Sequence, residues 1–231
     1  MKKFVKILVE VLLLAVICGL VYLIYNSINQ PVEFNKQVAR REKVGIERLK
    51  DIRTLQTAYK SVNGKYTGSI DSLKNFYENG EISILMQVGS KDDSLAMAHT
   101  EKIKRTLRGK GVNLQLQQLY EAGDKNLVFS FETKIPVKDT LFNHREDFCI
   151  DSLKYIPFSG GQEIEMEAIS RMVSGVQVPL FEARMPYKKL LKGLDNQLRI
   201  NLDADCKDRN RYEGLQVGSV TTPNNNAGNW E

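Results

Sequence analysis

The chain has 231 residues, 42% hydrophobic and 26% charged, enough for one membrane anchor and one domain of ordinary size. The formal net charge is +5, but residues 1–60 hold 11 Lys and Arg against 5 Asp and Glu, a balance of +6, so residues 61–231 carry −1. A nucleic-acid-binding domain would gather basic residues on its folded surface, so we expect no nucleic-acid partner, whereas a basic membrane-proximal segment suits anionic lipid headgroups.

A long apolar run near the N-terminus predicts a transmembrane helix. Residues 7–25 are apolar except for Glu10, and a helix of that length can cross the hydrocarbon core of a bilayer. A cleaved signal peptide needs a shorter apolar core and a small-residue cleavage site, and a lipoprotein signal needs a small residue before Cys18, where the chain has isoleucine. We therefore predict a retained anchor over residues 7–28, preceded by a cytoplasmic tail of residues 1–6.

The orientation of this anchor rests on charge. Basic residues at positions 2, 3 and 6 favour an N-terminus on the cytoplasmic side, although four basic residues between positions 36 and 43 weaken the asymmetry. A short tail kept inside leaves the large domain outside. We therefore expect a protein of the bacterial inner membrane with its C-terminal domain in the periplasm.

Residues 29–64 predict an amphipathic stalk helix, and Pro31 is expected to mark the break between this helix and the membrane anchor. Apolar side chains recur every three or four positions between residues 46 and 62, and Asn63-Gly64 is a typical helix end. This apolar stripe must be covered, either by the rest of the chain or by neighbouring protomers. The residues expected to make this packing are Ile46, Leu49, Ile52, Leu55 and Tyr59.

The remainder predicts a small α+β domain over residues 65–220, with a mostly antiparallel sheet. The expected helices cover residues 72–77, 93–108 and 186–194. The expected strands cover residues 81–88, 126–133, 163–168, 176–184 and 197–202. Pro179 inside a strand favours a sheet edge or a bulge. Residues 221–231 are polar and rich in asparagine, which predicts a flexible tail.

One five-residue sequence occurs twice. Ile-Asp-Ser-Leu-Lys stands at residues 70–74 and again at residues 150–154. The repeat is either two similarly capped short turns or the mark of a duplicated unit. The similarity beyond these five residues is too thin to decide.

The sequence carries no motif of a common enzyme class. It has no Cys-x-x-Cys, no Gly-x-Ser-x-Gly and no phosphate-binding loop, so we expect a protein that is not an enzyme. Cys149 and Cys206 could form a disulfide in an oxidising compartment or remain two free thiols. Asp203, Asp205 and Asp208 form an oxygen-rich segment of the kind that calcium prefers, although neighbouring basic residues would neutralise it in a solvated loop. We expect no cofactor, with calcium as the alternative.

Residues 7–80 resemble type IV pilins and the pseudopilins of type II secretion systems. Glu10 lies near the start of the apolar run and Gly19 follows nine positions later, as the carboxylate and glycine of that family do. Residues 55–66, LQTAYKSVNGKY, are similar to the segment that ends the family's long helix. Residues 1–6 contain no glycine, so the resemblance comes without a prepilin peptidase site.

The resemblance implies a long N-terminal helix that leaves the membrane and is followed by a small antiparallel sheet. It also implies helix packing in the membrane at Glu10 and Gly19, and it supports the calcium alternative because major pseudopilins hold calcium in a C-terminal loop. An ionised side chain in a bilayer is costly and usually has a function. Lys6, four residues earlier, could pair with Glu10; otherwise Glu10 lies in the headgroup zone and the span begins at Val11.

We therefore expect a single-pass, non-enzymatic structural or assembly component of a pilin-like or pseudopilin-like machine. Its partners would be membrane lipid and, through the N-terminal helix, other envelope proteins or copies of itself. The alternative is a membrane-tethered periplasmic binding or sensing domain that acts alone. An anchored enzyme without a recognisable motif is the third possibility.

Overall fold

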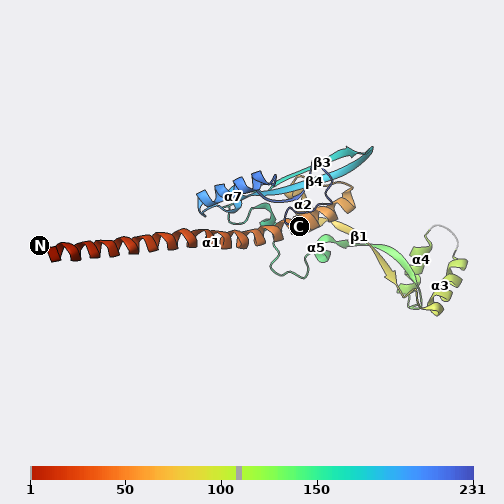
Figure 1. Cartoon of the computed structure of the whole chain (residues 1–231). Coiled ribbons are helices and arrows are strands. Elements are labelled where there is room, and N and C mark those ends of the chain that lie inside the picture. The colour runs from red at the N-terminus through yellow and green to blue at the C-terminus, as the bar shows by residue number, and fades with distance from the viewer. Residues whose placement is uncertain (1, 108–110) are drawn as a thin grey trace. The chain divides into compact units, whose positions relative to one another are not determined.

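The computed structural model describes residues 2–107 and 111–231. The chain forms helices and small antiparallel sheets, an α+β fold, and it divides into two compact units (Figure 1). Unit 1 comprises the described residues up to Thr57 together with Lys65–Ile70 and Cys149–Glu231. Unit 2 comprises Ala58–Gly64 and the described residues of Asp71–Phe148.

The longest element is helix α1, Lys2–Asn63, most of which belongs to unit 1. Its sequence is apolar on all faces at first and then carries an apolar stripe, as predicted for residues 29–64. The predicted break at Pro31 is wrong, because Pro31 lies inside the helix. Proline removes one backbone hydrogen bond of a helix, and the other hydrogen bonds of the adjoining turns carry α1 through Pro31.

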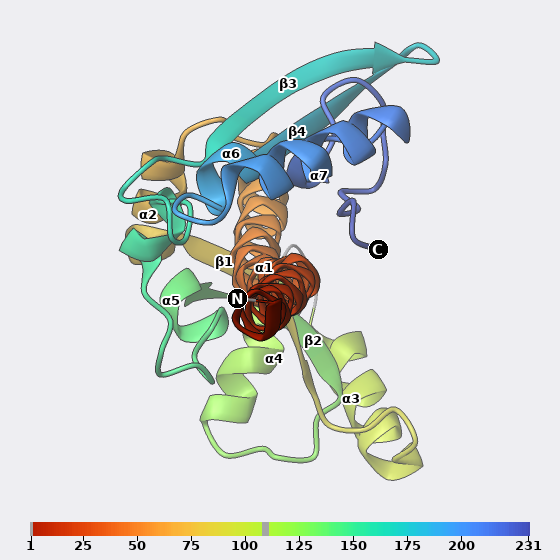
Figure 2. The ribbon, with the colours of Figure 1, turned by 60° about the vertical axis from the view of Figure 1, so that its left-hand side comes forward.

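Unit 1 joins α1 to a three-stranded antiparallel sheet. The strands are β3, Glu165–Val173, β4, Val176–Pro186, and β5, Gly214–Gly218, in the order β3-β4-β5. Figure 2 shows β3 and β4 as a long hairpin. The other elements are the 3-10 helix η1, Ile150–Lys154, and the helices α6, Tyr187–Leu190, and α7, Asn196–Asp208.

The core of unit 1 lies between α1 and the sheet. Leu49, Ile52 and Leu55 are completely buried, as are Phe181 and Met185 of β4. Burying one such side chain contributes about 1.5–3 kcal/mol. The stripe of α1 therefore supplies a large part of the stability of this unit.

The sequence predicts a sheet edge or a bulge at Pro179. Pro179 pairs with Ser170 of β3, and β5 pairs only with Glu182–Pro186 of β4. At Pro179, β4 therefore has a neighbouring strand on one side only, and the missing N–H of proline costs no bond on the other side. Of the two alternatives, a local edge and not a bulge is found at Pro179, although β4 is the middle strand of the sheet.

One predicted strand is wrong. Residues 197–202 belong to helix α7, although their alternation of apolar and polar residues is typical of a strand. The Asp195 side chain caps this helix by accepting a hydrogen bond from the Leu198 N–H at 2.9 Å. Arg199 and Asp203, four residues apart, then pair on its surface. The cap and the ion pair favour a helix over a strand.

Unit 2 is built around a two-stranded antiparallel ribbon of β1, Glu81–Val88, and β2, Phe129–Pro136. Its helices are α2, Ile70–Asn79, α3, Ser94–Thr106, α4, Val112–Glu121, and α5, Val137–Thr140. A small core of Leu116, Leu127 and Phe129 joins α4 to the ribbon. The strand predicted at 81–88 is confirmed, and β2 begins three residues later than predicted.

Several helix predictions can be compared with the structure. The helix predicted over residues 93–108 begins at Ser94 in the structure, and Asp93 caps it by accepting from the N–H groups of Leu95 and Ala96. The predicted end of this helix at residues 109–111 lies largely outside the described residues. Helices α4 and α5 and strand β5 were not predicted.

The repeated five-residue sequence forms two different structures. Ile70–Lys74 begins the α-helix α2, whereas Ile150–Lys154 is the 3-10 helix η1. The sheets that follow also differ, with two strands in one case and three in the other. The structure therefore offers no support for a duplicated unit.

The C-terminal residues 221–231 lie along β5. The Asn229 N–H donates to the Gln216 carbonyl at 3.0 Å, and the Gly218 N–H donates to the Ala227 carbonyl at 3.0 Å. Arg53 of α1 pairs with Glu231 at 2.6 Å. These bonds hold the polar segment on unit 1.

Candidate functional site

The most distinctive surface of unit 1 is the first part of α1. Large apolar side chains between Ile7 and Ile28 are exposed; Leu14, for example, is 65% exposed and Tyr22 is 67% exposed. No residue in the most apolar window of this helix is buried. A helix that is apolar all round needs a nonaqueous neighbour, which is either lipid or other protein. The helix is long and apolar enough to cross a membrane, which is compatible with membrane anchoring.

Glu10 and Gly19 both lie on this exposed part of α1. A side chain added at Gly19 would meet nothing within 4 Å, so this glycine has no packing role within a single chain. Glu10 has no ion pair among the described side chains, and the side chain of Lys6, its predicted partner, lies outside them. Residues nine positions apart on an α-helix are about 180° apart, so Glu10 and Gly19 face opposite sides.

The stripe of α1 is covered by the chain itself. Leu49, Ile52 and Leu55 are completely buried in unit 1, and Ile46 is half-buried. Tyr59 packs edge to face on Phe76 within unit 2, with ring centroids 5.3 Å apart. The part of α1 beyond residue 45 therefore has little apolar surface left for a neighbouring protomer.

Sequence reasoning missed the role of Gly45. A Cβ atom at this position would lie 2.7 Å from Cδ1 of Leu215 and 3.5 Å from Sδ of Met185. The absence of a side chain thus lets α1 approach the sheet closely. The available signal was that Gly45 is the one glycine between residues 33 and 62.

Polar bonds fix α1 in unit 1. The Arg41 guanidinium donates to the carbonyl oxygens of Leu190 and Lys192 at 3.1 Å and 2.9 Å, and burial lowers the pKa of Arg41. The Tyr187 hydroxyl donates to Oε1 of Glu42 at 2.5 Å, and burial followed by this bond raises the pKa of Tyr187. These groups sit on the helix face that carries the stripe.

Gln56 makes a second kind of polar bond inside unit 1. Its side chain is completely buried, and it both donates to the Thr67 carbonyl at 2.5 Å and accepts from the Thr67 N–H at 3.1 Å. The backbone of the segment after α1 is thereby bonded to the helix. A buried amide with both groups paired is well satisfied.

The predicted cysteine and calcium sites are not assembled. Cys149 is exposed, Cys206 is half-buried, and both are free thiols. Asp203, Asp205 and Asp208 lie on helix α7 and not in a loop, so their side chains point in different directions. Two of these carboxylates are already paired, Asp203 with Arg199 and Asp205 with Arg209. Within the described chain, no group of three or more metal-ligating side chains is found.

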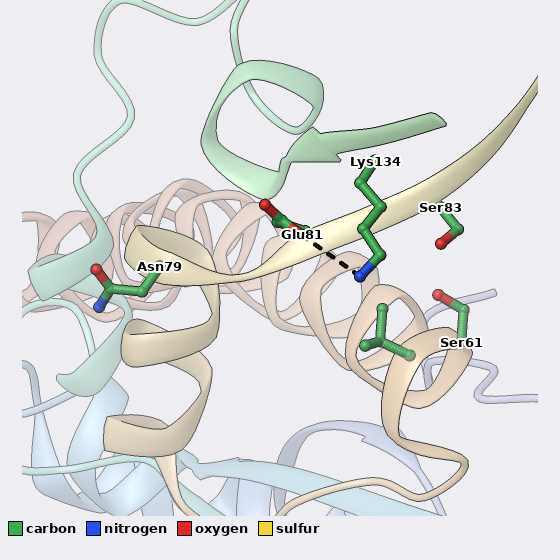
Figure 3. A pocket seen from close by; sticks show the side chains of 6 residues that line it. Ser61, Asn79, Glu81, Ser83 and Lys134 are labelled. Atoms are coloured by element: carbon green, nitrogen blue, oxygen red, sulfur yellow. Dashed lines mark ion pairs between the residues drawn. The ribbon is translucent and has the colours of Figure 1, made fainter. Parts of the chain in front are cut away.

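Unit 2 has a polar pocket of about 490 Å³ beside β1. Figure 3 shows Ser61 at the end of α1, Ser83 on β1, and Glu81 close to Lys134. Glu81 and Lys134 form an ion pair at 3.8 Å between two exposed side chains. Such a pair contributes about 0–1 kcal/mol. The lining is mostly polar and holds no histidine or cysteine.

No protein-family model matches the chain, and neither a curated protein nor a solved structure matches it. The class that the structure defines is therefore a broad one. It is an α+β protein with small antiparallel sheets and one long N-terminal helix that is apolar enough to span a membrane.

Proposed function

We propose that this chain is a single-pass protein of the bacterial inner membrane whose C-terminal units lie in the periplasm. Its function would be structural: a non-enzymatic component of a pilin-like or pseudopilin-like assembly. The observation that carries the proposal is the contrast along α1. The stripe beyond residue 45 is buried by the chain itself, whereas the first part of the helix exposes apolar side chains on every face.

Glu10 and Gly19 favour assembly over simple anchoring. An ionised carboxylate in the apolar part of a membrane helix is costly and rare, and a helix that only anchors has no use for it. Gly19 leaves a gap in the helix surface that nothing in the chain fills, and small residues let membrane helices approach closely. Because the two residues face opposite sides, they would contact two different neighbours, as in a repeating head-to-tail assembly.

A membrane-tethered binding or sensing domain that acts alone is the second candidate. One observation favours it: the stripe of α1 is covered within the chain, so this stripe needs no partner to bury it. The polar pocket beside β1 would be the binding surface in that case.

Replacing Glu10 tests the assembly proposal. We expect Glu10→Ala to reduce the mass of the complex extracted in mild detergent, while the protein stays in the membrane and its outer units stay folded. Glu33→Ala is the matched control, because Glu33 is a half-exposed acid on the same helix beyond the apolar run. An unchanged complex mass and unchanged co-purifying proteins in Glu10→Ala would contradict the proposal.

A further inference from the structure

The outer edges of the two sheets differ in how they are protected. Native proteins block exposed strand edges with charged residues, with proline, or by covering them. The C-terminal segment covers β5, since Asn229 and Ala227 bond to its backbone. The outer strands β2 and β3 are interrupted by charged residues and proline: Glu132, Lys134, Pro136, Glu165, Glu167 and Arg171.

The edge of β1 has no such protection. Its sequence is EISILMQV, and the one charged residue, Glu81, stands at the first position. Leu85 is 70% exposed and Met86 is 48% exposed. Neighbouring residues of a strand point to opposite faces, so both faces of the ribbon expose an apolar side chain here.

The free part of this edge begins beyond Ser83. Ser61 and Val62 of α1 line the pocket together with Glu81 and Ser83, so the first residues of β1 adjoin the end of that helix (Figure 3). In the parts of the chain that the structure describes, no strand pairs with β1 on the side away from β2. Residues 84–88 thus present unpaired backbone groups.

A two-stranded ribbon has a physical reason to gain a third strand. Such ribbons are marginally stable in water, and a third strand with an apolar face stabilises them. The bare edge of β1 offers backbone groups for pairing, and the exposed Leu85 and Met86 offer apolar surface for burial. The unpaired backbone groups and the exposed apolar side chains thus belong to the same segment, residues 84–88.

We propose that residues 84–88 of β1 pair antiparallel with the same residues of a second copy of this chain. The two ribbons then form one continuous four-stranded sheet around a two-fold axis. The segment is self-complementary: it carries no charge between Ile82 and Val88, and antiparallel pairing places the two Glu81 side chains at opposite ends. In this register Met86 lies on the axis opposite its equivalent, and Leu85 pairs with Gln87 of the second copy, so the two Leu85 side chains are diagonal neighbours on one face.

This contact goes beyond the proposed function and does not depend on the membrane helix. It lies in unit 2, whereas the helix contact would lie within the apolar part of α1 in unit 1. A chain that is not anchored would still pair through β1. A chain that assembles through α1 could lack the β1 contact.

Hydrogen exchange at β1 tests the pairing on the full-length protein in mild detergent. Amide exchange in residues 84–88 should be slower at high protein concentration and about tenfold faster in Leu85→Glu, because two like charges then become diagonal neighbours on one face beside the axis. Leu85→Lys should act in the same way. An equimolar mixture of the two variants should restore slow exchange, because opposite charges then meet.

Leu95→Glu is the matched control. Leu95 is 83% exposed on α3, so it is an equally accessible leucine of unit 2 away from the edge. Leu85 is itself largely exposed, so we expect both variants to fold, which circular dichroism would verify. Exchange that is independent of concentration and equal in wild type and Leu85→Glu would overturn the proposal. So would a mixture of the Glu and Lys chains that stays in fast exchange. Because exchange is read at β1 and the Glu10→Ala result is read as complex mass, either proposal can fail without the other.

Discussion

At the scale of single residues, a close approach of α1 to the sheet depends on a missing side chain. Gly45 faces Leu215, Met185 and Leu190, and an added Cβ atom would lie 2.7 Å from Leu215. Glycine is a poor helix former, by about 1 kcal/mol relative to alanine, so its presence inside a long helix needs a reason. Close packing on the sheet provides that reason.

Gly45→Val should therefore destabilise unit 1. Forcing a branched side chain into a filled core costs about 1–3 kcal/mol, and we expect a loss of this size in the free energy of unfolding measured with denaturant. Lys43→Val places the same side chain on the exposed face of the same helix turn and should change that energy by no more than about 0.5 kcal/mol. Equal effects of the two substitutions would show that Gly45 has no special contact.

Gln56 provides a second prediction at this scale. Gln56→Leu should lower the free energy of unfolding by about 1–3 kcal/mol, because the part-buried Thr67 N–H and carbonyl would lose their partner. Thermal and denaturant unfolding of the purified protein would measure the loss. Unchanged stability would mean that water or a rearranged backbone replaces both bonds.

The tyrosines of unit 1 predict a loss of stability in alkali. Burial raises the pKa of Tyr212 to about 12, above the value of about 10 in an unfolded chain. Folding then keeps the phenol neutral, so its stabilising contribution is complete below pH 10 and is lost as the pH rises from about 10 to about 12. The free energy of unfolding should fall over this range, and less steeply in Tyr212→Phe. Identical pH profiles would exclude this role.

At the scale of elements, α7 shows how local pattern and local chemistry can disagree. Residues 197–202 alternate as a strand does, but the side chain of Asp195 caps a helix that starts at Asn196. Asp195 also accepts from the Gln30 amide at 2.8 Å and so links α7 to α1. The cap could have been recognised from the sequence, whereas the bond to Gln30 could not.

Asp195→Ala should destabilise α7. Loss of an N-cap costs about 1 kcal/mol, and the bond to Gln30 is lost as well. Asp208→Ala is the control at the other end of α7, where a negative charge opposes the helix dipole, so its removal should be neutral or slightly stabilising. Hydrogen exchange of the α7 amides should be faster in Asp195→Ala and unchanged or slightly slower in Asp208→Ala. Equal exchange in both variants would contradict the capping role.

The elements that the sequence predicted well are those specified by local signals. The apolar run, the stripe of α1, the helix near residues 93–108 and the strand at 81–88 are local patterns of composition or period. Helix α4 and strand β5 were missed because α4 has no side-chain cap and β5 is five residues long with a glycine at each end. Their positions are set by contacts distant in sequence.

At the scale of the whole molecule, the sequence again predicted the local features of the candidate site and not its long-range contacts. The sequence located Glu10, Gly19 and the buried leucines and isoleucine of the stripe. It did not show that the chain would bury that stripe itself, because burial depends on residues more than a hundred positions away, such as Met185 and Leu215. The calcium hypothesis found no support because its aspartates lie on a helix.

The central claim is that the apolar part of α1 joins this chain to others within a membrane. The most direct test compares the mass of the full-length protein in mild detergent with that of a fragment of residues 31–231. Both should carry Leu85→Glu, so that the edge of β1 makes no contribution. The account predicts a multi-chain complex for the full-length protein and a monomer for the fragment. A full-length protein that is monomeric would contradict it.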